Sequence, residues 1–351
     1  MTGKEVPTNQ THVALDEKGL ASWLEDLPGA TRGPVTVRRL GTGHSNLTYR
    51  VVDAEGRQVV VRRPPRGNLA QSAHDVVREA RIMAALAPTC VPVPEVLGVA
   101  QTSSFCDAPL VVMSMLPGKA VTSRAIAAEL STGARGALGR ELIDAMVAIH
   151  SVDIEEVGLG DLASHAPYAQ RQLRRWKRQW DTTKTRESAL LEKLTERLQA
   201  TIPPQATTTL VHGDLHLGNL MCDPETGAAT GVVDWELATL GDPLSDIGSL
   251  LAYWPTRDGL VVPGFEAALA EGFPTGKELS QRYCQATGAE LGHIQYWHLF
   301  GLWKLAIIAE GVVRRVLNRP DNAAVSGAPT TQMVDQIIAY TDALADSYNI
   351  G

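Results

Sequence analysis

One stretch of this chain, from Val211 to Glu236, constrains its fold more than any other. The letters from His212 to Asn219 are His-Gly-Asp-Leu-His-Leu-Gly-Asn, and Val-Val-Asp-Trp-Glu follows, with Asp234 twenty residues after Asp214. Aliphatic and β-branched runs flank these polar residues and predict very short strands around loops. These runs are Thr209–Val211, Leu220–Cys222 and Gly231–Val233.

The polar residues of this stretch suit the transfer of a phosphoryl group. Such a transfer needs a carboxylate that orients the attacking hydroxyl and accepts its proton, and hard oxygen ligands that hold Mg²⁺. Asp214, Asn219 and Asp234 supply that set. Two other interpretations remain open. The same residues can cap turns, and His212, Asp214 and His216 can hold a transition metal in a hydrolase.

H-G-D-x-H-x-x-N followed by V-V-D-W-E resembles the aminoglycoside phosphotransferase and choline kinase-like family. Protein kinases would instead show His-Arg-Asp and Asp-Phe-Gly. The resemblance implies that Asp214 is the catalytic base, that Asn219 and Asp234 bind Mg²⁺, and that ATP is the phosphoryl donor. It also implies that the segment from Gly241 to Asp246 leads into a helix that closes the site, although Asp246 is equally an N-cap candidate.

The resemblance implies an α+β, protein-kinase-like fold of two lobes. Residues 1–115 would form the nucleotide-binding lobe, a small antiparallel sheet of five strands with one helix, and residues 116–351 the larger, mainly helical catalytic and substrate-binding lobe. Apolar periodicity and turn residues agree with this plan. Strands are predicted at Val35–Leu40, Leu47–Val52, Gln58–Arg62, Val96–Val99 and Leu110–Met115. Helices are predicted at Leu15–Leu27, Ala73–Leu86, Arg135–Ser151, in one or two pieces at Pro167–Leu198, and from Gln281 onward.

A glycine-containing turn between the first two predicted strands is a candidate phosphate-binding loop. Glycines let backbone N–H groups approach phosphates closely, although a plain hairpin turn is the common alternative. The loop resembles the phosphotransferase version, in which a serine replaces the third glycine of the protein kinases. The candidate residues are Gly41, Gly43, His44, Ser45 and Asn46.

The third predicted strand lacks the lysine that kinases place there. Arg62 aligns with that lysine and could contact the phosphates instead, while Arg63 should point to the other face of the strand. Glu79 is the helix carboxylate expected to pair with the basic residue, or else belongs to a solvated helix face. Backbone groups of a hinge should bond the adenine, at Met113, Ser114 and Met115.

The segment from Tyr168 to Trp180 has an apolar stripe and a basic face when drawn as a helix. The stripe contains Trp176, and the basic face contains Arg171 and Arg175, together with Arg174 and Arg178. This face is either solvated or binds an anionic substrate. The R-Q-x-x-R-W pattern resembles the branch of the family whose kinase-like domain is found fused to acyl-CoA dehydrogenases. That branch implies hydroxy acids or their CoA esters as substrates. Further candidate substrate contacts are His216, Glu236 and Asp242.

The composition and charge of the chain limit the classes of protein to which it can belong. The chain of 351 residues has a net charge of −7, which argues against a broad nucleic-acid surface. Its four cysteines are far apart, and it shows no signal peptide or membrane-spanning run, so a cytoplasmic protein is expected. The function predicted is ATP- and Mg²⁺-dependent phosphorylation of a hydroxyl on a small anionic metabolite. The alternatives are a kinase of aminoglycosides or other small alcohols, and a non-catalytic nucleotide-binding pseudokinase.

Overall fold

The computed structural model describes residues 15–40, 46–65, 75–101, 103–256, 259–318 and 329–350. These residues form two compact units. The first contains the described residues up to Ala84 together with Pro94–Met115, and the second contains Ala85–Val93 and the chain from Leu116 onward. The ranges expected from the sequence, 1–115 and 116–351, differ from this division in the segment Ala85–Val93, which groups with the second unit.

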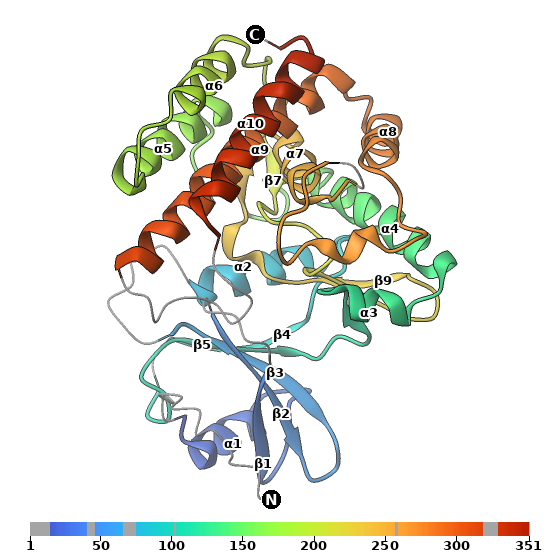
Figure 1. Ribbon diagram of the computed structural model, residues 1–351. Helices are drawn as coiled ribbons and strands as arrows, with labels where there is room; N and C mark the ends of the chain where they lie inside the picture. Colours follow the sequence, from blue (N-terminus) through green and yellow to red (C-terminus); the bar gives the residue numbers. More distant parts are fainter. Residues whose placement is uncertain are drawn as a thin grey trace, which may run out of the picture. The chain divides into compact units, whose positions relative to one another are not determined.

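The first unit is built on an antiparallel sheet of five strands in the order β1-β2-β3-β5-β4 (Figure 1). The predicted sheet is therefore confirmed, and each strand lies within one or two residues of its expected bounds. In β3 every second side chain is buried, the pattern of a strand with one face on a core. The strands are β1 Val35–Leu40, β2 Leu47–Asp53, β3 Gln58–Arg63, β4 Val96–Ala100 and β5 Leu110–Ser114.

Two helices accompany this sheet, α1 at Glu17–Glu25 and α2 at Val76–Leu86. Asp16 caps α1, because its side chain accepts a hydrogen bond from the Lys18 N–H. Leu20 and Leu24 of α1 are fully buried and join the hydrophobic core under the sheet.

The second unit is mainly helical and contains two small sheets. One sheet pairs β7 with β10, and the other has the order β6-β8-β9. The helices are α3 Arg124–Glu129, α4 Thr132–His150, α5 Tyr168–Thr183, α6 Ala189–Ala200, α7 Leu244–Tyr253, α8 Gly276–Thr287, α9 Leu291–Asn318 and α10 Thr331–Ser347. The short elements are β6 Lys119–Ala120, β7 Thr209–Val211, β8 Leu220–Cys222, β9 Ala229–Val232, η1 Trp235–Leu237, β10 Thr239–Gly241 and η2 Glu266–Leu269.

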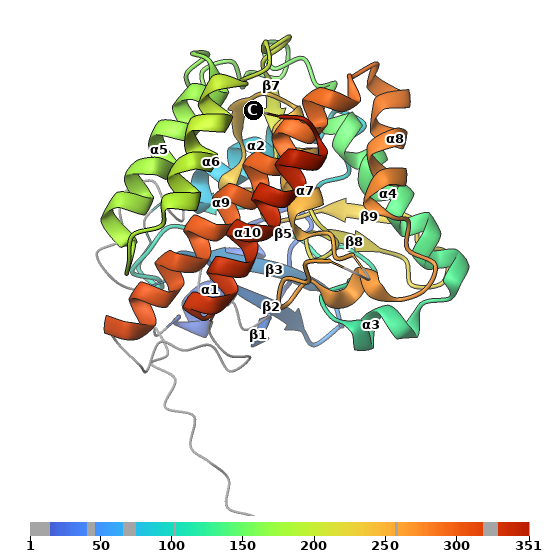
Figure 2. The same ribbon diagram turned by 45° about the horizontal axis from the view of Figure 1, so that its top comes forward.

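The core of the second unit lies along α9, beside which α5, α6 and α10 run (Figures 1 and 2). Its largest buried side chains include Trp180, Trp297 and Trp303. Helix α7 crosses α9 at two glycines. A Cβ on Gly248 would lie 2.3 Å from the Trp297 carbonyl oxygen, and one on Gly301 would lie 2.7 Å from the Gly248 carbonyl oxygen. Glycine is therefore required for this close contact, which fixes α7 on the core.

Within the described residues, no helix combines the length and apolar character that crossing a bilayer requires.

Candidate active site

The loop between β7 and β8 presents Asp214. Asn219, at the end of this loop, donates a hydrogen bond from its side-chain amide to the Asp214 backbone carbonyl at 2.9 Å, and the same nitrogen lies 3.3 Å from the Asp214 carboxylate. The Asp214 side chain is 31% exposed, whereas Asn219 is buried. The loop therefore holds a carboxylate that a ligand can reach, with its geometry fixed by a buried amide.

The hairpin of β8 and β9 brings Asp234 to this pair. The Val233 N–H donates to the Asn219 carbonyl oxygen at 3.0 Å, so Asp234 directly follows a residue bonded to Asn219. Its backbone adopts the left-handed conformation, with φ 69° and ψ 62°. A non-glycine residue held there costs about 1–3 kcal/mol, and such residues cluster at functional sites. The three residues that the sequence singled out are thus neighbours on one set of loops.

A buried carboxylate of α7 holds the loop that carries Asp214. Asp246 accepts hydrogen bonds from the backbone N–H groups of His212 at 2.7 Å and Gly213 at 2.8 Å. It is not the N-cap of α7: that position is Pro243, which makes no side-chain capping bond. The N-cap interpretation of Asp246 is therefore wrong, and its carboxylate instead satisfies two backbone donors of the predicted catalytic loop.

Asp246 is the end of a buried chain of polar contacts. His150 lies 3.2 Å from its carboxylate through Nε2 and 2.8 Å from the Tyr283 hydroxyl through Nδ1. Burial raises the pKa of Asp246, but the bond to His150, the charges of His150 and His212 and the Gly213 N–H outweigh it and hold that pKa below its usual range. Sequence reasoning missed His150 and Tyr283, because α4 and α8 supply them from distant parts of the chain.

The two histidines of the loop have different surroundings. His212 is fully buried, its Nε2 lies 3.1 Å from the Val233 carbonyl, and its Nδ1 accepts from the Asp214 N–H at 3.3 Å. Burial lowers the pKa of His212, in keeping with a neutral ring. Both ring nitrogens are therefore engaged, which argues against the hypothesis of a transition-metal site. Among the residues described, His, Cys, Asp and Glu side chains form no group of three that could hold a metal.

His216 is half-buried beside the predicted base. Its Nδ1 accepts a hydrogen bond from the Gly218 N–H at 3.0 Å, and its Nε2 lies 3.6 Å from the Asp214 carboxylate. Because Nδ1 is an acceptor, a neutral ring carries its proton on Nε2, which faces Asp214. At 3.6 Å this is a close contact rather than a hydrogen bond, and the same Nε2 lies 3.4 Å from the Asn219 side-chain nitrogen.

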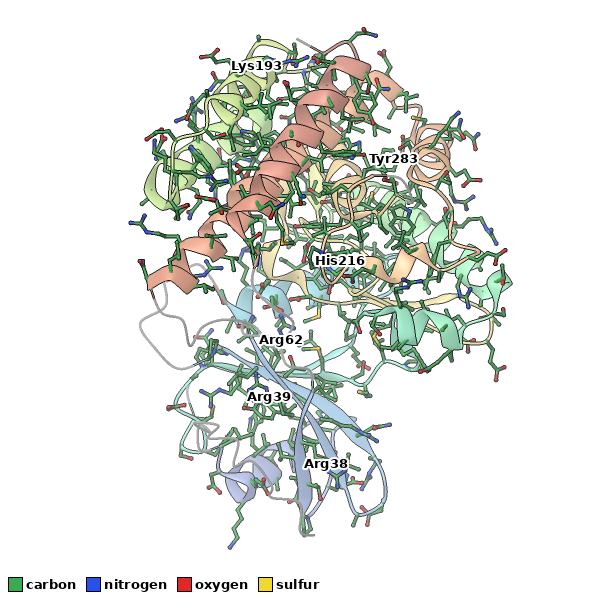
Figure 3. The ribbon with its side chains drawn as sticks, viewed as in Figure 1. Arg38, Arg39, Arg62, Lys193, His216 and Tyr283 are labelled. Atoms are coloured by element: carbon green, nitrogen blue, oxygen red, sulfur yellow. The ribbon has the colours of Figure 1, made fainter. Side chains whose placement is uncertain are left out.

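In the first unit, Arg62 of β3, which Figure 3 labels, forms an ion pair with Glu79 of α2 at 3.0 Å. Glu79 is buried and also accepts from the Asn46 side-chain amide at 2.5 Å, so the solvated-face interpretation of Glu79 is wrong. Arg63 is buried instead with Asp107 at 3.0 Å. Arg62, rather than Arg63, thus makes the ion pair with the helix carboxylate that was expected of the residue replacing the lysine, and its contact with the phosphates stays a prediction.

The remaining nucleotide-binding candidates are only partly described. Gly41, Gly43, His44 and Ser45 lie outside the described residues. Ser114 ends β5, and its N–H donates to the Glu95 carbonyl at 2.8 Å. Met113 is buried and Met115 half-buried. Adenine contacts at these three hinge residues stay a prediction.

Helix α5 displays the expected stripe and basic face. An open groove of about 690 Å³ runs along its cationic side chains. The guanidinium of Arg171 is tied to the carbonyls of Ser164 and Leu240, which favours a structural role for it. The groove is lined by Arg171, Gln172, Arg174, Arg175, Lys177, Arg178, Gln199 and Thr239.

A second cation, missed by sequence reasoning, joins this face at Trp176. The guanidinium carbon of Arg175 lies 5.5 Å from the centre of the Trp176 ring, and the Lys304 ammonium of α9 lies 5.3 Å from it. Burial lowers the pKa of Lys304, and attraction to Asp214 and Asp246 opposes that shift. Lys304 lies within an apolar stretch of α9, far from Asp214 in sequence, so no sequence pattern indicated that the two residues interact.

The two other acidic candidates lie close to the loop. Glu236 is half-buried in η1, two residues after Asp234. Asp242 is buried, and its carboxylate accepts from the Leu244 N–H at the start of α7 at 2.9 Å. That contact favours a structural role for Asp242.

The chain resembles known proteins over most of its length. Residues 36–279 match the model of the phosphotransferase enzyme family. The chain is 34% identical over 337 residues to acyl-CoA dehydrogenase family member 10 of Mus musculus, covering 94% of this chain and 31% of that protein. It thus spans about a third of the length of that relative.

Solved structures show the same fold. A suggested aminoglycoside phosphotransferase of Ralstonia eutropha superposes with a TM-score of 0.77 and 28% identity, covering 93% of this chain and 98% of that one. Aminoglycoside phosphotransferase APH(4)-Ia in complex with ADP and hygromycin B gives a TM-score of 0.58 at 16% identity, covering 95% and 98%. The α+β, kinase-like fold expected from the sequence is therefore confirmed, and the chain belongs to the phosphotransferase enzyme family and is a small-molecule kinase.

Proposed function

We propose that this chain transfers the γ-phosphoryl group of ATP, with Mg²⁺, to a hydroxyl of a small anionic metabolite, either a hydroxy acid or its CoA ester. The observation that carries the proposal is the convergence of Asp214, Asn219 and Asp234 on loops held by the buried Asp246. An accessible carboxylate beside two oxygen donors is what phosphoryl transfer to a hydroxyl requires.

Asn219 and Asp234 fit the needs of Mg²⁺, which prefers hard oxygen ligands. The Asn219 amide nitrogen is turned toward Asp214, so its amide oxygen is left as the ligand atom, and Asp234 offers a carboxylate. The metal would supply charge neutralisation of the phosphates. The ADP complex of the structural neighbour supports a nucleotide donor, and the Arg62–Glu79 ion pair supports Arg62 as a contact of the α- and β-phosphates.

Asp214 is the group proposed to accept the proton of the acceptor hydroxyl. Asn219 fixes the loop around its carboxylate, and the His216 Nε2 faces that carboxylate from 3.6 Å. A general base must come within about 2.6–3.2 Å of the proton donor that it serves. The exposure of the Asp214 side chain leaves room for that approach.

The charges around α5 support an anionic acceptor. Within the described residues neither Arg175 nor Lys304 has an ion-pair partner, although both contact Trp176. Two basic side chains on one indole ring, beside a groove of further cations, attract carboxylates or phosphates and repel polycations. The name of the mouse relative, an acyl-CoA dehydrogenase family member, supports acyl acids or their CoA esters as the class.

The four cysteines are free, which supports a reducing compartment, and we propose the cytoplasm as the location.

A panel of acceptors tests the substrate class. Hydroxy acids, their CoA esters, sugars, choline and aminoglycosides are incubated with ATP and Mg²⁺, and phosphorylated products are identified by mass spectrometry. We expect turnover of the acids or their CoA esters. Preferential turnover of an aminoglycoside or choline would refute the anionic class. In Lys304→Met, KM for the anionic acceptor should rise about ten-fold, with KM for ATP unchanged.

A further inference from the structure

A half-open pocket of about 90 Å³ lies within the second unit and is lined in part by His216, a neighbour of the predicted base. Leu217 of the β7–β8 loop, Leu250 of α7, and Ala267 and Ala268 of η2 contribute aliphatic walls. His216 and Phe265 also line it. Thr122 contributes a polar wall as well, but most of the lining is apolar, and apolar walls take up apolar groups of matching size.

Aromatic rings give the cavity a defined shape. Tyr253 stacks on Phe265 with ring centres 4.3 Å apart and planes 10° apart. His216 meets Phe265 edge-to-face at 5.0 Å. These contacts fix the ring positions without occupying the cavity itself, so the space is a preformed feature of the fold.

Two walls of the cavity are also neighbours of Asp214. His216 Nε2 lies 3.6 Å from the Asp214 carboxylate. Burial raises the pKa of Tyr253, and the nearby Asp214 carboxylate raises it further. Because His216 lines the pocket and its Nε2 lies 3.6 Å from the Asp214 carboxylate, the pocket adjoins the position where an acceptor hydroxyl would meet Asp214.

We propose that this cavity binds a short aliphatic chain of the acceptor, attached to the carbon that bears the reacting hydroxyl. By proportion to a cavity of 150 Å³ that holds the six carbons of benzene, it holds about four carbons. The inference rests on the proposed function and narrows it. The acceptor is an aliphatic secondary alcohol with an anionic group, rather than a sugar or another polyol, whose hydroxyls would lose their hydrogen bonds in such a space.

Three variants test whether this cavity binds the aliphatic chain of the acceptor. Ala268→Leu fills it, Phe265→Ala enlarges it, and Ala270→Leu is a matched control, because Ala270 ends η2 without lining the cavity. The acceptors are hydroxy acids with a fixed spacing from carboxylate to hydroxyl and a tail that lengthens one carbon at a time. Saturation-transfer NMR with 1-butanol measures cavity binding without turnover, and circular dichroism checks the fold of each variant.

In the wild type, kcat/KM should rise about four-fold per added methylene up to about four carbons, and then fall. Ala268→Leu should shift the optimum to shorter tails and Phe265→Ala to longer ones, while Ala270→Leu follows the wild type. Butanol should bind the wild type and Ala270→Leu but not Ala268→Leu. A profile independent of tail length, or equal butanol binding by Ala268→Leu, overturns the inference. If no acid is phosphorylated but butanol binding still depends on Ala268, the proposed function fails while the apolar site stands.

Discussion

The buried Asp246 carboxylate accepts a hydrogen bond from the His212 backbone N–H at 2.7 Å, and so ties the loop of Asp214 to helix α7. Helix α7 is in turn packed against α9 at Gly248 and Gly301. The position of the predicted base is therefore set by the core of the second unit, and not by the loop alone.

Replacing Asp246 with Asn should slow turnover. The amide has one oxygen acceptor, so one of the N–H groups now bonded to the two carboxylate oxygens loses its partner, at a cost of about 1–3 kcal/mol in the free energy of unfolding. A shift of the loop should lower kcat about 10²-fold with KM for ATP little changed. Steady-state kinetics and urea unfolding measure both effects. The matched control is Asp181→Asn, which removes a surface ion pair with Lys177. Equal behaviour of the two variants would contradict the supporting role of Asp246.

The left-handed backbone of Asp234 predicts a separation of stability from activity. Asp234→Gly relieves the strain and should stabilise the fold by about 1 kcal/mol, whereas Asp234→Ala removes the carboxylate but keeps the strain. Both should lose Mg²⁺-dependent turnover. Thermal unfolding compares the two variants, and we expect a higher midpoint temperature for Asp234→Gly than for Asp234→Ala. An alanine variant as stable as the glycine variant would show that the conformation stores no strain.

The ion pair of Arg62 and Glu79 predicts a change in nucleotide affinity. Glu79→Gln removes the negative charge with which Arg62 pairs and should raise KM for ATP about ten-fold, with a smaller change in kcat. Glu55→Gln is the control, since the Glu55 carboxylate is exposed and forms a surface ion pair with Arg57 in the same unit. Titration with a fluorescent ATP analogue measures the affinity. Unchanged affinity in Glu79→Gln would remove Arg62 from the predicted nucleotide site.

Burial of His298 predicts a loss of stability in mild acid. It lowers the pKa of His298 to about 4, from an ordinary value of 6.5. The unfolded chain then binds a proton that the folded chain does not, so the free energy of unfolding falls as the pH drops from about 6.5 toward 4. Urea midpoints at several pH values measure this fall.

His298→Gln should flatten that dependence without abolishing it, because burial lowers the pKa of His212 as well. His293→Gln, on an exposed turn of the same helix, is the control. A slope unchanged by His298→Gln would contradict a role for this residue.

The sequence predicted the local elements well, because they depend on short patterns. Short β-prone runs separated by turn residues placed β1, β2 and β3 to within one residue of their bounds. The short strand β10 and the helix α3 were not predicted. β10 has three residues and pairs with β7, about thirty residues earlier in the sequence, so its formation depends on a distant partner rather than on its own pattern.

The site was predictable where its residues follow one another in sequence. Asp214, Asn219 and Asp234 lie within a single stretch, and fixed loop geometry makes their spacing informative. His150, Tyr283 and Lys304 could not be found this way, because three separate helices bring them to the loop. Asp246 was noticed, with capping as one of two equal interpretations, since a carboxylate near a helix start has the same sequence pattern whether it caps its own helix or holds a neighbouring loop.

Transfer of the γ-phosphoryl group from labelled ATP to the best acceptor, compared between the wild type and Asp214→Asn, tests the proposed function most directly. The wild type should form the phosphorylated product only with Mg²⁺ present. Asp214→Asn should bind ATP with unchanged affinity and form product about 10²–10⁴-fold more slowly. Equal rates in the two proteins, or no transfer to any acceptor by the wild type, would contradict the assignment of Asp214 as the catalytic base of a small-molecule kinase.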